Sequence, residues 1–144
     1  FDNTMAQLLK WNVLPIINEN DTVSTTEIKI GDNDTLAAIV AESVGADLLV
    51  LMSDIDGLFD SDPHQNPNAK FIERIDEWSD ELMKLGGCAG SARGTGGMFT
   101  KLKAAKIVTE SGCDMIIMNG AFPENLYNII DGKPIGTRFF AKKG

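Results

Sequence analysis

Residues 47–58 read DLLVLMSDIDGL, and this stretch decides the fold class. Residues 47–52 are almost entirely apolar and do not alternate with polar side chains, which is typical of a strand covered on both faces in a parallel sheet. The acidic, glycine-containing turn that follows ends the strand. Two other short apolar runs have the same character, residues 13–17 and 115–118, and residues 136–140 are predicted to form a late strand.

Helix-like segments separate these strands. We expect helices within residues 1–11, 34–43, 76–85 and 100–111. Asp34 stands where it could cap the first turn of its helix, and Gly112 follows the last turn of another, as glycine often does. The order of strand, helix, strand, helix, strand predicts an α/β fold with right-handed crossovers.

Composition narrows the class of protein. The 144 residues contain 21 acidic and 13 basic side chains, so the net charge is −8, which argues against broad binding to nucleic acid or to anionic lipid. No apolar run approaches the roughly 18 residues of a membrane span, and no signal peptide is recognised. Cys88 and Cys113 have neither metal-binding nor redox spacing, so we interpret them as packing residues of a reduced, cytoplasmic protein.

A glycine-rich segment leads into the helix predicted at residues 100–111. Residues 86–101 read GGCAGSARGTGGMFTK and hold six of the 14 glycines. Glycines allow backbone N–H groups to approach an anion, and the helix N-terminus and Lys101 in the first turn would add positive charge. The segment is not a P-loop, because Thr100 and Leu102 flank the lysine, and Phe99 excludes the dinucleotide fingerprint. The alternatives are a phosphate site and a surface loop without a ligand.

Three polar clusters complete the candidate site. Residues 18–21 (NEND) and Ser53-Asp54 each follow a predicted strand, where open parallel sheets bind ligands. Residues 31–34 (GDND) open a helix, and capping would explain only one of their side chains. Solvated turns remain the alternative for the first cluster, and capping for the third. The only histidine, His64, lies in a loop and is interpreted as a solvated side chain.

Taken in order, four segments resemble the amino acid kinase family, and within it the branch that phosphorylates glutamate. They are residues 15–21 (PIINEND), 31–34 (GDND), 51–58 (LMSDIDGL) and 94–101 (GTGGMFTK). Acetylglutamate, aspartate and uridylate kinases share the Ser-Asp turn and the helix opening of the Asp34 type. The combination of INEND with GTGGM-x-TK points to the glutamate branch, and the resemblance covers essentially the whole chain.

This resemblance implies an αβα sandwich with a mainly parallel sheet. It also implies ATP-dependent phosphorylation of the side-chain carboxylate of L-glutamate to L-glutamyl 5-phosphate, the first step of proline biosynthesis. Mg²⁺ would be carried by the nucleotide, so no metal-binding side chain is expected. Proline would act as a feedback inhibitor, and the protein would be a cytoplasmic homo-oligomer without nucleic-acid or membrane partners.

The resemblance also implies roles for particular residues. Asp21 and Asn33 would bind the substrate, and Ser53 and Asp54 would contact ATP. The ATP-binding loop would comprise Thr95, Gly96, Gly97, Met98, Phe99, Thr100 and Lys101. Lys101 would act near the transferred phosphoryl group, and Asp34 would be the acidic residue that orients the active-site lysines.

The resemblance further predicts how the domain is divided. The family begins with a strand that carries a lysine and a glycine-serine loop, followed by a second glycine-bearing segment, and residues 1–144 contain neither. They are therefore predicted to be the C-terminal, nucleotide-binding part of the domain, without its N-terminal part and without an RNA-binding-like C-terminal domain. The alternatives are a non-catalytic nucleotide-binding fragment and another kinase of the family, acting on uridylate or acetylglutamate.

Overall fold

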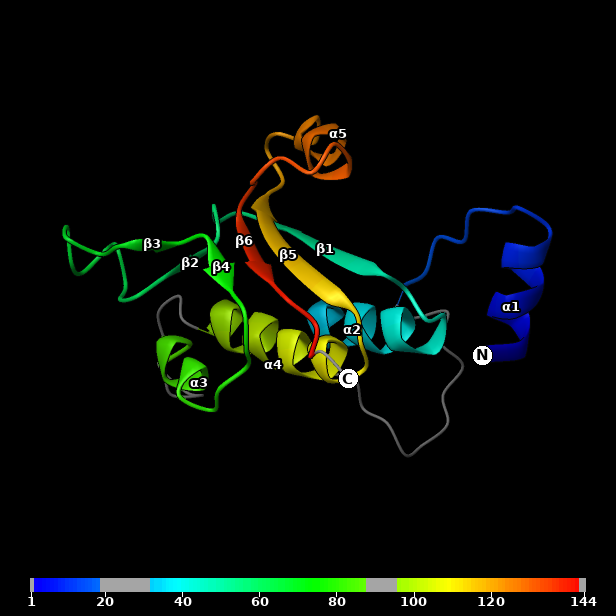
Figure 1. Cartoon of the computed structure of the whole chain (residues 1–144), viewed down its shortest axis with the longest axis horizontal. Coiled ribbons are helices and arrows are strands. Elements are labelled where there is room, and N and C mark those ends of the chain that lie inside the picture. Colours follow the sequence, from blue (N-terminus) through cyan, green and yellow to red (C-terminus); the bar gives the residue numbers. More distant parts are fainter. Residues whose placement is uncertain (1, 19–31, 88–95, 143–144) are drawn as a thin grey trace.

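The computed structural model describes residues 2–18, 32–87 and 96–142, and it confirms the α/β class (Figure 1). The helices are α1 (Asp2–Lys10), α2 (Asn33–Ser43), α3 (Leu82–Leu85), α4 (Gly96–Glu110) and α5 (Asn125–Ile130). The strands are β1 (Leu48–Ser53), β2 (Leu58–Phe59), β3 (Phe71–Ile72), β4 (Arg74–Ile75), β5 (Asp114–Asn119) and β6 (Thr137–Phe139). The predicted strands at 47–52, 115–118 and 136–140 correspond to β1, β5 and β6.

Four of the strands form one sheet in the order β1-β5-β6-β4. β1 and β5 are parallel, with Leu48 opposite Asp114 and Ser53 opposite Asn119. β6 runs antiparallel to β5 and parallel to β4, so the sheet is mixed but mostly parallel. β2 and β3 form a separate antiparallel pair. Because β1 and β5 are in register and parallel, their carboxyl ends meet at the same edge of the sheet.

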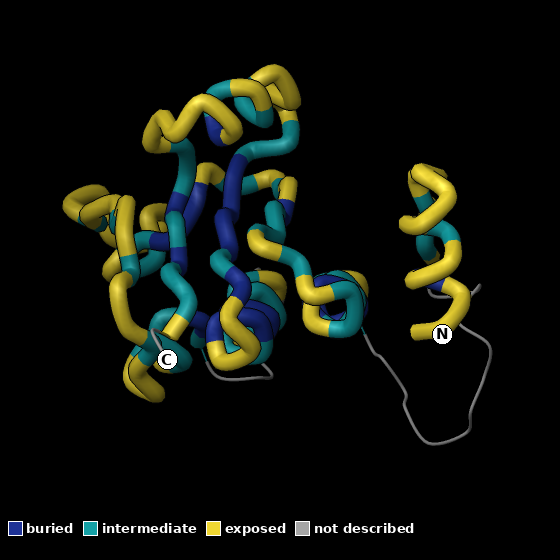
Figure 2. Tube along the Cα trace, turned by 45° about the vertical axis from the view of Figure 1, so that its right-hand side comes forward, coloured by how far each residue is buried: buried dark blue, intermediate teal, exposed yellow. Residues whose placement is uncertain are grey.

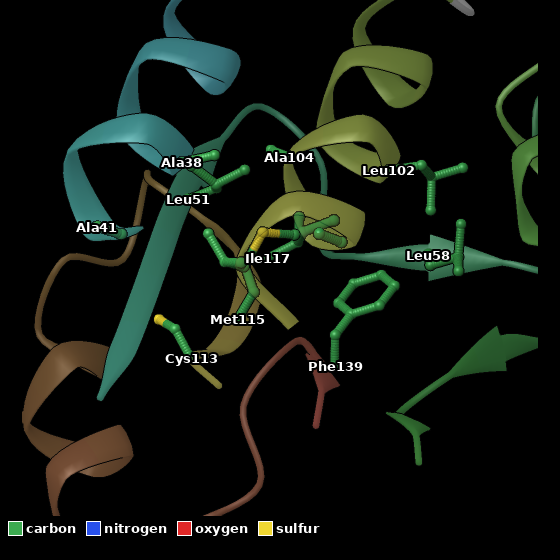
Figure 3. Packing of buried hydrophobic residues seen from close by; sticks show 12 residues of the cluster. Ala38, Ala41, Leu51, Leu58, Leu102, Ala104, Cys113, Met115, Ile117 and Phe139 are labelled. Atoms are coloured by element: carbon green, nitrogen blue, oxygen red, sulfur yellow. The ribbon is translucent and has the colours of Figure 1, made fainter. Parts of the chain in front are cut away.

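The two faces of the sheet are covered by different helices. In β5, Met115 and Ile117 belong to the larger core with α2 and α4, whereas Ile116 and Met118 belong to a second cluster with Ile129 of α5. Figure 3 shows Met115 and Ile117 among the buried side chains of the larger cluster. Side chains of a strand alternate between faces, so one apolar strand joins both layers. This arrangement confirms the αβα layering.

Small side chains let α2 and α4 pack closely under the sheet. Ala38 of α2 and Ala104 and Ala105 of α4 are fully buried. The distance between packed helices depends on the side chains at their contact, and alanines permit a near approach. The two helices therefore form one layer, with their amino-terminal ends able to share a site. Gly112, at φ +90°, ends α4 as predicted.

Gly136 makes the turn into β6 possible. Its φ is +63°, and a Cβ built on it would lie 1.9 Å from the backbone oxygen of Ile117 in β5. Glycine is therefore required here both for its backbone conformation and for the close approach of the two strands.

The predicted strand at residues 13–17 was wrong. Residues 13–18 have no strand structure, and Leu14 and Ile16 are 85% and 91% exposed. A strand needs a neighbouring strand to satisfy its backbone groups, and none of the described strands pairs with this segment. Figure 2 shows that the adjoining helix α1, which confirms the helix predicted in residues 1–11, stands apart from the sheet.

Two helix predictions need corrected bounds. Within residues 76–85, only Leu82–Leu85 is helical. The Asp80 carboxylate accepts hydrogen bonds from Lys106 Nζ of α4 at 3.2 Å and from Trp78 Nε1 at 3.4 Å. These contacts hold the residues before Leu82 against α4 in a conformation that is not helical. α4 begins at Gly96, four residues before the predicted start, so Lys101 lies beyond the first turn. None of the helices in the described ranges is long and apolar enough to cross a membrane.

Candidate functional site

The carboxyl ends of β1 and β5 are fastened together by polar groups. The Gly120 N–H donates to the Ser53 backbone oxygen at 2.7 Å, and Asn119 Nδ2 donates to Asp56 Oδ1 at 2.9 Å. Ser53 Oγ donates to Asp54 Oδ1 at 3.1 Å. The Ser-Asp turn is therefore held against the end of β5. Sequence analysis did not identify Asn119, although a polar residue directly after an apolar strand was the available signal.

Gly57 brings the β2–β3 pair close to the start of β6. A Cβ at Gly57 would lie 2.5 Å from Thr137 Oγ1 and 2.8 Å from the Phe71 ring. The buried Thr137 hydroxyl accepts a hydrogen bond from the Leu58 N–H at 2.8 Å and donates to the Ile72 oxygen. One side chain thus holds both strands of the pair on the sheet. Only a residue without a side chain fits at position 57.

At the start of α2, one aspartate caps the helix and another contacts a different helix. The N-cap is Asp32, whose Oδ1 accepts from the Thr35 N–H at 2.6 Å and whose Oδ2 accepts from Thr35 Oγ1 at 2.9 Å. The prediction that Asp34 is the cap was therefore wrong. A cap lies outside the first helical turn, whereas Asp34 lies within it and projects toward a different neighbour.

Asp34 contacts α4, more than sixty residues away in sequence. Lys101 Nζ donates to Asp34 Oδ2 at 3.1 Å, and Thr100 Oγ1 donates to the same oxygen at 2.6 Å. The side chains of Lys101 and Asp34 are 12% and 20% exposed, so the ion pair is mostly shielded from water. The contact between Asp34 and Lys101 that the resemblance implied is present. It is reached from the second turn of α4, because this helix starts at Gly96.

A cavity of about 580 Å³ opens where these elements meet. Its lining comprises Ser53, Asp54, Ile55, Gly57, Leu58, Phe59, Ser61, Asp62, Pro63, His64, Gln65, Leu85, Gly97, Met98 and Lys101. Sites for small ligands are commonly about 300–1,000 Å³. The structure thus brings Ser53 and Asp54 to the same cavity as Gly97, Met98 and Lys101, residues to which the resemblance assigns ATP contacts.

Some of the predicted site residues lie away from this cavity or outside the described residues. Phe99 and Thr100 belong to α4 but do not line the cavity, Gly96 is the first residue of α4, and Thr95 lies outside the described residues. Asp21 also lies outside them. Among the residues that the structure describes, no three His, Cys, Asp or Glu side chains gather as a metal-binding group.

A second, mostly apolar groove of about 460 Å³ runs along α2 and the start of β1. Asn18 and Asn33 line it, together with residues such as Leu36, Val40 and Leu48. Asn33 therefore borders this groove, whereas the next residue, Asp34, contacts a lysine of the first cavity. The start of α2 thus stands between two openings.

The loop between β2 and β3 supplies a wall of the cavity that sequence analysis missed. Lys70 N–H donates to Asp60 Oδ1 at 2.8 Å, and His64 N–H donates to Asp62 Oδ1 at 2.9 Å, so the loop is ordered by its own side chains. His64 is exposed and borders the cavity. The spacing of Asp, Asn and Pro in residues 60–68 was the available signal for such a loop.

Cys113 is a packing residue, as predicted. It belongs to the larger core, and burial raises the pKa of its thiol because an apolar environment disfavours the thiolate. Cys88, the other cysteine, lies outside the described residues.

Comparison with known proteins identifies the family. A sequence model described as the amino acid kinase family matches residues 1–119. The chain belongs to the amino acid kinase family. A protein named glutamate 5-kinase from Thermoanaerobacter sp. (strain X514) is 57% identical over 97% of this chain and 38% of its own length. One of the same name from Clostridium perfringens is 51% identical over 99% of this chain and 54% of its own length.

The likeness extends to solved structures of kinases. The solved structure of carbamate kinase from Giardia lamblia bound to AMP-PNP matches 98% of this chain and 44% of its own chain, with a TM-score of 0.67 and 22% sequence identity. At this identity the likeness shows the fold alone, which is that of an amino acid kinase. Since the chain spans 38% and 54% of the two relatives, it corresponds to a part of each.

Proposed function

We propose that this chain is part of an enzyme that transfers the γ-phosphoryl group of ATP to the side-chain carboxylate of L-glutamate. The product would be L-glutamyl 5-phosphate, the first intermediate of proline biosynthesis. The observation that carries the proposal is Lys101, held by Asp34 at the cavity beside the strand ends. The 57% identity to a glutamate 5-kinase over nearly the whole chain supports glutamate over uridylate or acetylglutamate as the substrate.

The groups at the cavity suit phosphoryl transfer from a nucleotide. The amino-terminal end of α4 is a positive dipole end built on glycines, which suits a polyphosphate, and Lys101 adds a full charge one turn further on. Mg²⁺ bound to the phosphates would neutralise part of their charge. Such transfer depends on positioning and charge stabilisation, so a covalent nucleophile on the protein is not needed.

The acceptor carboxylate can attack without help from a base. A glutamate side chain has a pKa near 4.3 in water and is ionised at neutral pH, so its oxygen is already a nucleophile. We propose that Asp21 binds the substrate ammonium group and that Asn33 helps to hold the substrate. Asn33 stands one residue before Asp34, so a substrate bound there would lie near the lysine that Asp34 orients.

We also propose that residues 1–144 are the C-terminal, nucleotide-binding part of the catalytic domain. Within the described residues, β1 is at an edge of the sheet although its sequence, LLVLMS, contains none of the charged residues or prolines that commonly protect an exposed edge strand. The apolar groove beside it is a further surface that ordinary domains cover. Strands from the preceding part of the domain would complete the sheet at this edge.

An assay with ATP and L-glutamate tests the proposed function. It should be run on this chain and on the longest natural polypeptide that contains it, with ADP release and hydroxylamine trapping of the acyl phosphate as readouts. We expect glutamate-dependent turnover in the longer polypeptide. Nucleotide binding there without turnover would favour the non-catalytic alternative, and efficient phosphorylation of UMP or acetylglutamate would replace glutamate as the substrate.

Asp21→Ala is expected to weaken glutamate binding far more than ATP binding. A charge-assisted hydrogen bond to the substrate ammonium group is worth about 1.5–3 kcal/mol, which corresponds to roughly 10- to 150-fold in affinity. Titration of each ligand by calorimetry in the longer polypeptide measures both effects. The exposed carboxylate of Asp131, at the end of α5, offers the control Asp131→Ala. Equal losses for both ligands would mean that Asp21 has a structural role.

The remaining implications of the resemblance are proposals as well. We propose that L-proline inhibits the enzyme, that it forms a homo-oligomer and that it acts in the cytoplasm. Adding proline to the glutamate assay tests the first, and light scattering of the longer polypeptide tests the second. Turnover unchanged by millimolar proline, or a monomeric mass, would reject the corresponding proposal.

A further inference from the structure

The hydroxyl group of Thr100 joins the ion pair of the site without lining its cavity. Thr100 Oγ1 lies 2.6 Å from Asp34 Oδ2, the oxygen that also accepts from Lys101 Nζ at 3.1 Å. We propose that Thr100 is a positioning residue, whose hydroxyl fixes the Asp34 carboxylate so that Asp34 holds Lys101 at the cavity. This inference rests on the proposed function, in which Lys101 stabilises the transferring phosphoryl group.

The single proton of the Thr100 hydroxyl is already used within the protein. Its two acceptors are Asp34 Oδ2 at 2.6 Å and the Gly97 backbone oxygen at 2.9 Å. A hydroxyl has one proton, and a hydrogen bond to a carboxylate is stronger than one to a neutral carbonyl. The remaining lone pairs of Oγ1 do not attract an anionic phosphate oxygen. Thr100 therefore acts on Asp34 and not on ATP.

Lys101, by contrast, keeps a donor for the cavity. Its ammonium group has three protons, and it contacts Asp34 Oδ2 at 3.1 Å and the Gly97 oxygen at 3.4 Å. The third proton can be given to a ligand in the cavity that Lys101 lines. The two protein acceptors therefore set the direction of the amine without using all of its donors.

A second contact to Asp34 matters because the lysine side chain is long and flexible, so a single ion pair to it fixes the orientation of the carboxylate only weakly. Holding both side chains in one geometry costs conformational entropy even where the pair is shielded from water. Here consecutive residues of α4 bond to the same carboxylate oxygen of α2, so the carboxylate cannot turn away without losing both contacts. Misplacing a group by about 1 Å can cost up to a hundredfold in rate.

A double-mutant cycle on the longest natural polypeptide tests this coupling. Thr100→Val removes the hydroxyl at nearly constant shape and should lower kcat about tenfold while changing the KM for ATP less than about threefold. Thr100→Ser keeps the hydroxyl and should recover most of the lost turnover. If Thr100 acts through Asp34, Thr100→Val should have almost no further effect in the Asp34→Asn variant. Additive losses, or a tenfold rise in the KM for ATP with kcat unchanged, would overturn the proposal.

A second readout does not depend on catalysis. The rate at which an amine-directed acylating reagent labels Lys101, followed by peptide mass spectrometry, should rise several-fold in Thr100→Val and in Asp34→Asn, and no further in the double variant. Unchanged labelling in Thr100→Val would refute the positioning role. Should the parent polypeptide show no glutamate turnover, the proposed function fails, and the labelling cycle alone decides the role of Thr100.

Thr109 provides a matched control on the same helix. Its buried hydroxyl donates to the Ala105 oxygen at 2.7 Å within α4, and it lines neither cavity. Thr109→Val makes the same chemical change away from the site and should leave kcat and Lys101 labelling unchanged. A drop in kcat as large as that of Thr100→Val would show that the loss reflects the helix and not Asp34.

Discussion

Lys101→Met is expected to slow phosphoryl transfer by about a hundredfold or more, while ATP affinity changes less than about tenfold. Negative charge develops on the transferring group and the bridging oxygen mainly in the transition state, so an ammonium group aimed there contributes more to rate than to ground-state binding. Methionine keeps most of the aliphatic stem and removes the charge. The amino-terminal end of α4, which starts at Gly96, would still attract the phosphates.

The test compares kcat and ATP affinity in the longest natural polypeptide, with circular dichroism to verify the fold. Lys106 is the matched control on the same helix: its side chain is 42% exposed and its partner Asp80 is 84% exposed. Lys106→Met should be nearly silent, because surface substitutions usually stay within about 0.5 kcal/mol. Near-normal turnover of Lys101→Met would reject its catalytic role.

Gly136→Ala is expected to lower the free energy of unfolding by about 3 kcal/mol or more. Its φ of +63° already disfavours a side chain, and the new Cβ would lie 1.9 Å from the Ile117 oxygen. The Ile117 oxygen is a backbone atom and cannot move aside as the end of a flexible side chain could. The strands β5 and β6 must therefore separate at the pair Ile117–Thr137. This region carries Thr137, whose hydroxyl holds the β2–β3 pair beside the cavity.

Gly132 separates the two parts of this effect. It has φ +78°, and a Cβ built on it meets no atom within 4 Å. Gly132→Ala should therefore show only the cost of a left-handed conformation, about 1–2 kcal/mol. Denaturant unfolding of both variants measures the difference. If the two substitutions cost the same, the close approach of Gly136 to β5 does not matter for stability.

The chain's own pattern was enough to predict the strands of the central pair. Residues 47–52 and 115–118 are apolar on both faces, and β1 and β5 are indeed packed between α2 and α4 on one side and α5 on the other. The same pattern failed at residues 13–17, because an apolar run becomes a strand only when a partner strand lies beside it. Local propensity indicates that a segment can be a strand, and pairing decides whether it is one.

For the candidate site, too, the sequence predicted some features, whereas others depend on the tertiary structure. The sequence predicted Asp34, Lys101 and the Ser-Asp turn as candidate site residues, because each belongs to a polar cluster beside an apolar element. The structure places Lys101 and the Ser-Asp turn at one cavity and pairs Lys101 with Asp34. The residues around Asp32 and Asp34 do not show which of the two carboxylates caps α2, because the side chains are chemically identical. Only the family resemblance assigned the contact with the lysine to Asp34.

The tertiary structure decides those partners, because they come from segments that are far apart in the chain. Thr100 and Lys101 reach Asp34 across separations of 66 and 67 residues, and Asn119 reaches Asp56 across 63. These contacts depend on the packing of α2 against α4 and on the parallel register of β1 with β5. Residue types and their local order are properties of the sequence, whereas the direction of a side chain depends on which helix or strand packs opposite it.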